Sequence, residues 1–479
     1  MDVQSTDLFI NGQWSPAIAG GQIDIIDPAT EEVVTQAAQA GADDVNKAID
    51  AAHEALQSWR KVAPWDRSKV LRKASMLVAE RADHIARLLT IECGKPLAQS
   101  KAEVMGTVEL IDWFADEARR IFGRSLQGRN GNNRFVTIHE PVGVVGAFTA
   151  WNFPVLLQSR KIAPALAAGC TIVTRPAEEG TSAVVELVKC FIDAGAPAGT
   201  VNLVTGKPEV ISDTIMASDL VRKVTFTGSI PVGQMLMRRA ADTVKRMSME
   251  LGGHAPVIIH EDVDPEKTAI AAAIGKARNN GQVCVSPTRF YVHKKHEQAF
   301  TEHFTKALGA MKIGHGLDAD TEIGPLINKK RLDFVEGMVA DTLNEGANLA
   351  LGGKRPADKN KGYFYEPTVF TGVRDDMRVM NDEPFGPIAP VTTFEDFDDV
   401  VARANSLSYG LAGYVFTNNQ NLAMKTMEAL RTGIVGVNNY VAATAEMPFG
   451  GVNHSGFGRE NGPDGLQDYM DTKFANIMI

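Results

Sequence analysis

The sequence predicts an α/β protein built from two doubly wound parallel-sheet domains in tandem. Its 479 residues are more than one hydrophobic core usually organises, so we expect more than one domain. Short segments that are apolar throughout alternate with helical segments, which is typical of a parallel sheet covered on both sides. The first series of strands is expected at 142–148, 170–174, 200–205, 223–227 and 246–250. The second is expected at 255–259, 287–293, 410–417 and 433–438.

Two amphipathic segments precede the first strand series. Residues 43–60 place Val45, Ile49 and Leu56 on one helical face. Residues 66–94 repeat this pattern, and we expect Asp66 to cap the helix at its start and Gly94 to end it. Both helices are expected to cover a sheet.

Composition and charge exclude several classes of function. The net charge is −9 and there is no basic run, which argues against nucleic acid as a partner. The first residues lack the basic and apolar regions of a secretory signal, and no apolar run is long enough to span a membrane. Four cysteines without a CxxC pair are typical of the reducing cytoplasm, where we expect the protein to work.

Two segments fit neither domain. Residues 128–141 contain an Asn-Gly turn signal between extended arms, so we expect a protruding β-hairpin. Residues 468–479 end in an apolar, strand-like tail. Exposed strand edges need partners, and a second copy of the chain is the simplest one. We therefore expect a homodimer or a homotetramer.

The phosphate-binding and metal-binding signals are mostly negative. Neither the GxGxxG fingerprint nor the Walker motif occurs. His293 and His296 have an HxxH spacing but no further ligand nearby, so no metal site is predicted. The stretch "FTGSIPVG" offers a substitute, because a strand ends at Thr227 and a glycine turn then opens a helix. The free N–H groups at such a helix N-terminus suit a phosphate.

One cysteine follows a predicted bend of the chain. In "RNNGQVC", Cys284 comes after two asparagines and a glycine, six positions after Arg278. Asn152 in "WNFP" and Glu250 in "MELGG" lie at the ends of predicted strands, where open α/β sheets place their sites. A thiolate, an amide donor for an oxyanion and a carboxylate base together form an acyl-transfer site. The alternative is that Asn152 caps a helix, Glu250 is a surface charge and Cys284 is a small core residue.

Several longer motifs resemble those of a known family. "WNFP", "FTGSIPVG", "MELGGHAP", "RNNGQVC", "NDEPFGP" and "EMPFGGVNHSGFGRENG" occur in this order over the whole chain. The sequence thereby resembles the NAD(P)-dependent aldehyde dehydrogenase superfamily, and within it the succinate semialdehyde and 2-oxoglutarate semialdehyde dehydrogenases. The resemblance implies an aldehyde dehydrogenase-like fold with an oligomerisation hairpin and strand. It also implies a cofactor-binding domain at 1–119 and 141–252, a catalytic domain at 253–452, and an oligomerisation element at 120–140 and 453–479.

The resemblance implies a role for each matching position. Cys284 would be the nucleophile, Asn152 would stabilise the oxyanion and Glu250 would activate the water that hydrolyses the thioester. Lys161 and Glu460 would lie on the proton route of Glu250. The residues expected to bind the cofactor are Trp151, Arg175, Glu178, Gly206, Gly228, Ser229, Glu383 and Phe385.

One departure from the family pattern concerns the cofactor. Arg175 stands where the family usually has a lysine, and it could accept the additional phosphate of NADP. Glu178 matches a position that bonds the ribose hydroxyls and would repel that phosphate. We therefore expect NAD, with NADP as the alternative.

Two arginines bear on the substrate. Arg160 and Arg278 match positions that bind a distal carboxylate, so a carboxylated semialdehyde of succinate, glutarate or 2-oxoglutarate is expected. The alternatives are a dehydrogenase for uncharged aliphatic or aromatic aldehydes, a coenzyme-A-acylating enzyme and a non-catalytic protein on the same fold. Glu250 argues against the acylating enzyme, since a water-activating base would destroy its thioester.

Overall fold

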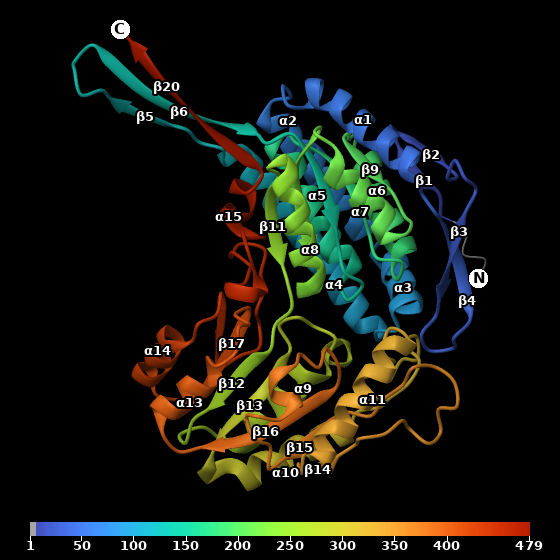
Figure 1. The fold of residues 1–479 in the computed structure, drawn as a ribbon, viewed down its shortest axis with the longest axis vertical. Helices are drawn as coiled ribbons and strands as arrows, with labels where there is room; N and C mark the ends of the chain where they lie inside the picture. Colours follow the sequence, from blue (N-terminus) through green and yellow to red (C-terminus); the bar gives the residue numbers. More distant parts are fainter. Residues whose placement is uncertain (1–5) are drawn as a thin grey trace.

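The first of two α/β domains contains a sheet with a parallel centre. The computed structural model describes residues 6–479 (Figure 1). Five central strands are parallel, and the three outer ones are antiparallel to their neighbours. In spatial order the strands are β19 (Gly456–Phe457), β11 (Arg246–Glu250), β10 (Val221–Thr227), β7 (Val144–Phe148), β8 (Thr171–Arg175), β9 (Val201–Leu203), β1 (Leu8–Ile10) and β2 (Gln13–Ser15).

Helices cover both faces of this sheet, as expected from strands that are apolar on both sides. The helices α1 (Ala42–Trp59), α7 (Pro208–Ala217) and α8 (Ile230–Ala240) share one apolar core with the sheet. The other face packs against α5 (Pro154–Ala168) and α6 (Thr181–Asp193), with α2 (Pro64–Glu80), α3 (Ala82–Cys93) and α4 (Leu97–Glu117) in the same core. A separate two-stranded sheet consists of β3 (Gln22–Ile26) and β4 (Val33–Ala38).

The helix predicted from Asp66 to Gly94 is two helices, and Asp66 is not its N-cap. The N-cap is Ala63, and Pro64 occupies the first helical position, where its fixed φ and missing N–H are tolerated. Asp66 lies within the first turn, where a carboxylate complements the helix dipole. The helical conformation is interrupted at Arg81, which separates the two helices. Gly94 ends the second helix in the left-handed conformation, as predicted.

The second domain repeats the architecture. Its sheet is parallel except for the edge strand β14. The strand order is β14 (Asn348–Leu351), β15 (Thr368–Thr371), β16 (Ile388–Phe394), β13 (Pro287–His293), β12 (Ala255–Ile259), β17 (Ala412–Phe416) and β18 (Ile434–Val437). One face packs against α9 (Pro265–Ala277) and α10 (Glu297–Gly309). The other packs against α11 (Lys329–Asn344), α12 (Arg378–Asn381) and α13 (Phe397–Ala404), and α14 (Gln420–Ala429) lies beside β17.

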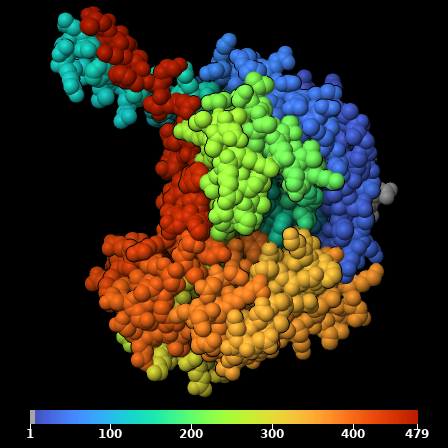
Figure 2. All heavy atoms as spheres, viewed as in Figure 1, coloured from blue at the N-terminus to red at the C-terminus, as the bar shows by residue number. Residues whose placement is uncertain are grey.

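The predicted hairpin and C-terminal strand form one antiparallel sheet. The strands β5 (Arg124–Gln127) and β20 (Met470–Met478) both pair with β6 (Asn133–Pro141). Figure 1 shows this sheet extending away from both domains, and Figure 2 shows it protruding from one corner of the surface. Upstream of β20, the strand β19 and the helix α15 (Gly462–Gln467) pack against the first domain, through β11 and α5 respectively.

No helix within residues 6–479 has the length and apolar character needed to cross a membrane.

Candidate active site

A cavity of about 830 Å³ lies between the two domains. The carboxyl ends of β7, β10 and β11 lead into it, which is where open parallel sheets place their ligands. Most of the predicted site residues line it: Trp151, Asn152, Arg160, Arg175, Glu178, Gly228, Ser229, Glu250, Arg278, Cys284, Glu383 and Phe385. Three predicted residues, Lys161, Gly206 and Glu460, lie outside its lining.

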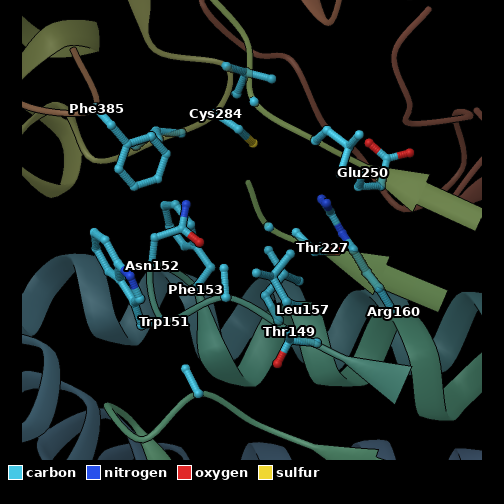
Figure 3. Close-up of a pocket in the computed structure, with 18 of the residues that line it drawn as sticks. Thr149, Trp151, Asn152, Phe153, Leu157, Arg160, Thr227, Glu250, Cys284 and Phe385 are labelled. Carbon is cyan, nitrogen blue, oxygen red and sulfur yellow. The ribbon is translucent and has the colours of Figure 1, made fainter. Parts of the chain in front are cut away.

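The bend before Cys284 is an unusual backbone conformation. Asn279, Asn280 and Gly281 all have positive φ, with values of 45°, 53° and 72°. Asparagine tolerates this region better than other side chains do, and a Cβ at Gly281 would lie 2.1 Å from the carbonyl oxygen of Gly386. The bend carries Cys284 to the cavity, where it is half-buried, whereas the other three cysteines are fully buried. Figure 3 shows its sulfur pointing into the cavity.

The Cys284 thiol is not activated in this state. Burial raises its pKa to about 12, and the carboxylate of Glu383 adds to this, while Arg160 opposes it. A thiol with such a pKa is protonated at neutral pH, although the thiolate is the nucleophilic form.

Asn152 lies between β7 and α5. Its amide Nδ2 donates to the carbonyl oxygen of Gln282 at 3.2 Å, so it reaches the loop of Cys284 from the opposite domain. The second hydrogen of this amide remains for a ligand. The N-cap of α5 is Phe153 without a side-chain cap, so Asn152 does not cap this helix.

Glu250 is the last residue of β11 and is 4% exposed, so it is not a surface charge. Its Oε2 atom has no hydrogen-bond partner. Burial raises its pKa to about 8, against the opposing influence of Lys161 and Arg160. Figure 3 shows its carboxylate and the sulfur of Cys284 on the same side of the cavity. A carboxyl group that titrates near neutral pH suits general base catalysis.

Lys161 and Glu460 form an ion pair behind the cavity. The Lys161 side chain is fully buried, and this burial lowers its pKa to about 7. Arg160 also approaches Glu460, with 3.7 Å between Nη1 and Oε2. The Arg160 guanidinium lies 4.2 Å from the ring centre of Phe449 and is 5% exposed.

Arg278 is in a different state from Arg160. Its side chain is exposed and lines the cavity. Within residues 6–479 it forms no ion pair with a carboxylate, and its guanidinium lies 5.0 Å from the ring centre of Phe153. Arg278 is therefore a cation that remains for an anionic ligand.

The other end of the cavity has features that fit a dinucleotide. After β10 the chain passes Gly228 and Ser229, the N-cap of α8, with Pro231 in the first turn, as predicted. A Cβ at Gly228 would lie 2.4 Å from the Phe226 ring, so there is no room for a side chain at this position. A phosphate can therefore come close to the free N–H groups at the start of the helix. Arg175 pairs with Glu178 and donates to the carbonyl oxygen of Gly206 at 3.1 Å, so Gly206 contacts a residue of the cavity lining.

Glu383 and Phe385 also line the cavity. Glu383 accepts from the backbone N–H of Gly253 at 3.1 Å, and burial raises its pKa to about 7. Phe385 has a φ of 41°, which is strained for a bulky residue. Its ring stands nearly perpendicular to that of Trp151 at 5.3 Å (Figure 3). This strain fits a functional position.

The sequence analysis missed three residues of the site. Arg331 lines the cavity and lies 5.5 Å from the Phe385 ring, but a lone arginine in an amphipathic helix gives no signal. Glu103 also lines the cavity, and it forms a buried ion pair with Lys95 next to Asn152. The only feature of the sequence that marks Lys95 is its position directly after Gly94, which ends a helix.

Comparisons with known proteins agree with this geometry. Residues 14–475 match the model of the aldehyde dehydrogenase family. The chain belongs to this family. It is 40% identical to the NADP+-dependent succinate-semialdehyde dehydrogenase of Escherichia coli, with all of both chains covered. It is also 40% identical to the glutarate-semialdehyde dehydrogenase of Pseudomonas putida, over 98% of this chain and 97% of the relative.

A solved structure shows the same fold. The NAD+ complex of an aldehyde dehydrogenase from Bacillus cereus has a TM-score of 0.97 and 37% identity, over 99% of this chain and 97% of that chain. The predicted aldehyde dehydrogenase-like fold is thus confirmed. The protein is an oxidoreductase of the aldehyde dehydrogenase family that oxidises aldehydes with NAD(P)+.

The raised pKa of Cys284 predicts how the thiol reacts with an alkylating agent. Because the thiolate is the reactive form, labelling of Cys284 by iodoacetamide should accelerate roughly tenfold per pH unit between about pH 7 and about pH 9. Cys284 should still be labelled before the three buried cysteines. Peptide mass spectrometry of the cofactor-free protein measures both. A rate that levels off below about pH 8 would contradict the raised pKa.

Proposed function

We propose that this aldehyde dehydrogenase oxidises an aldehyde with a remote anionic group, namely a semialdehyde of succinate, glutarate or 2-oxoglutarate. The observation that supports this most is Arg278, an exposed cation without a carboxylate partner inside the cavity. A carboxylate of the substrate would supply the missing partner. The names of the relatives from E. coli and P. putida agree, since both denote semialdehyde dehydrogenases.

In the proposed mechanism Cys284 attacks the aldehyde carbon as a thiolate and forms a thiohemiacetal. The free amide hydrogen of Asn152 and the backbone N–H of Cys284 stabilise the negative charge on the former carbonyl oxygen. The chemistry that a bound NAD(P)+ would supply is an acceptor for the hydride of this carbon. Cys284 then carries the acyl group as a thioester, which is hydrolysed to release the acid.

Glu250 is proposed to activate the hydrolytic water. Its unpartnered Oε2 atom and its raised pKa suit a base that takes a proton from water. Lys161 and Glu460 lie behind it, and Glu460 Oε2 is also buried without a hydrogen-bond partner. We propose that this pair passes the proton from Glu250 toward solvent.

The contacts of Arg175 with neighbouring protein groups support a preference for NAD over NADP. The Arg175 guanidinium is already engaged by Glu178 and by the Gly206 carbonyl, so its charge is partly satisfied. Glu178 lines the cavity and would repel an additional phosphate. We propose that Trp151, Gly228, Ser229, Glu383 and Phe385 hold the rest of the cofactor.

We further propose that the protein is a homodimer or homotetramer in the cytoplasm. The extended sheet exposes Leu126, Ile138 and Phe474, which a second copy would bury. All four cysteines are free thiols, and a reducing compartment keeps them so.

Substituting Arg278 tests the proposed substrate class. Arg278→Met should lower kcat/KM for succinate semialdehyde roughly ten- to a hundredfold, because a charged hydrogen bond is lost. The same variant should oxidise butanal, an uncharged aldehyde of equal length, at nearly the wild-type rate. NADH or NADPH formation is measured by absorbance with each cofactor in turn. Equal losses on both aldehydes would exclude Arg278 as the anion contact and leave the dehydrogenase assignment intact.

Glu250→Gln should separate oxidation from hydrolysis. Without the base, each site should release about one NADH in a burst and then stall with the acyl group on Cys284. In the wild type, steady turnover should rise as the pH passes through about 8, because Glu250 becomes ionised there. Stopped-flow absorbance measures the burst, and Cys284→Ala, which should show neither phase, is the control. Loss of the burst in Glu250→Gln would mean that Glu250 already acts at or before the oxidation step and would contradict this prediction.

The exposed apolar side chains of the extended sheet predict that the oligomer forms through this sheet. Phe474→Asp introduces a charge into the surface that a second copy would bury, so it should shift the protein toward smaller species. Light scattering coupled to gel filtration measures the mass. Val244→Asp, at a residue that is 80% exposed outside this sheet, is the control. An unchanged mass for Phe474→Asp would contradict this interface.

A further inference from the structure

A buried ion pair lies beneath the turn that carries Asn152. The side chains of Lys95 and Glu103 are both completely buried, with 2.5 Å between Nζ and Oε2. The Lys95 ammonium also donates to the backbone carbonyl oxygen of Asn152 at 2.6 Å, and it lies 4.2 Å from the ring centre of Phe153. The hydrogen bonds and the ring contact of this ammonium are thus with Glu103 and with the turn of Asn152 and Phe153.

Glu103 binds the start of the helix that follows the turn. Its Oε1 atom accepts from the backbone N–H groups of Val155 at 3.0 Å and Leu156 at 3.2 Å. These N–H groups belong to the first turn of α5, where they have no partner within the helix. Together, Lys95 and Glu103 hold the turn at both of its ends.

The same turn is linked to the loop of Cys284. The carbonyl oxygen of Asn152 accepts a second hydrogen bond, from Nδ2 of Asn279 at 3.0 Å, and Asn279 belongs to the left-handed bend before the cysteine. The amide of Asn152 donates to Gln282. Lys95 therefore contacts one of the two Asn152 atoms through which this turn is joined to the Cys284 loop.

The neighbouring helix shows that capping alone does not need the lysine. At the start of α6, Glu92 accepts from the N–H of Ser182 at 3.0 Å and is 1% exposed. No cation pairs with Glu92 in the described part of the chain. Glu92 and Glu103 therefore both bind N–H groups at the start of a helix, α6 and α5 respectively. Of these two carboxylates, only Glu103 also pairs with a lysine.

We propose that Lys95 and Glu103 are positioning residues for aldehyde oxidation, which act by holding Asn152 where its amide meets the oxyanion. This inference rests on the proposed role of Asn152. Because the pair touches Asn152 through the backbone, its loss displaces the amide without removing it.

Lys95→Met tests this positioning role. A displacement of about 1 Å at a catalytic group costs up to about a hundredfold in rate, so NADH formation in a single turnover should slow by about ten- to a hundredfold. The dissociation constant for NAD+, measured by fluorescence, should change less than about twofold. Glu103→Gln should behave in the same way, whereas Glu92→Gln, the matched control at α6, should retain the wild-type rate.

A double substitution separates positioning from a general loss of stability. In the Asn152→Ala background, Lys95→Met should have less than about a twofold further effect, because the group that it positions is already gone. The proposal would be overturned if Lys95→Met lowered the single-turnover rate by the same factor in the wild-type and Asn152→Ala backgrounds. It would also be overturned if Glu92→Gln lowered this rate as much as Lys95→Met does. A normal rate for Asn152→Ala alone would refute the role of Asn152 and this inference with it. Should Lys95→Met not fold, Glu103→Gln takes its place in the cycle.

Discussion

The site depends on hydrogen bonds across the junction of the two domains. Asn152 belongs to the first domain, and it both donates to Gln282 and accepts from Asn279 of the second domain. The bend at Gly281 is equally constrained, since a Cβ there would meet the Gly386 carbonyl. Cys284 and Asn152, the proposed nucleophile and oxyanion donor, come from different domains, so their relative position depends on how the domains pack. The proposed chemistry therefore depends on the junction of the two domains and not on a single strand or loop.

Burial is the second constraint, and it shifts the pKa of several ionisable groups near Cys284. It raises the pKa of Cys284, Glu250 and Glu383 and lowers the pKa of Lys161. The common effect is to favour neutral forms in the cavity. A positive charge near Cys284 stabilises its thiolate, and Arg160 already acts in this direction against the effect of burial.

Much of the fold could be predicted from the sequence, because strands of parallel sheets are locally apolar and helices have their own periodicity. The predicted segments around Val144, Thr171 and Arg246 are strands, and the bend before Cys284 follows from asparagine and glycine alone. The helix start near Asp66 was predicted wrongly, because Pro64 specifies it more strongly. Lys95, Glu103 and Arg331 could not be found, since their contacts with Asn152, Val155 and Phe385 join segments that lie far apart in the chain. Such contacts have no local pattern.

The two arginines predicted to bind the substrate show most clearly that a residue type does not reveal its contacts in the fold. As residue types they are identical, but Arg160 lies beside Glu460 and the Phe449 ring, whereas Arg278 has no carboxylate partner. Removing Arg160 would leave the buried Glu460 with one cation fewer, so its loss would disturb the site for every substrate. Removing Arg278 leaves no protein carboxylate unpaired. The proposed selectivity for an anionic aldehyde therefore rests on Arg278, whereas Arg160 adds to the positive charge around Glu250 and Glu460.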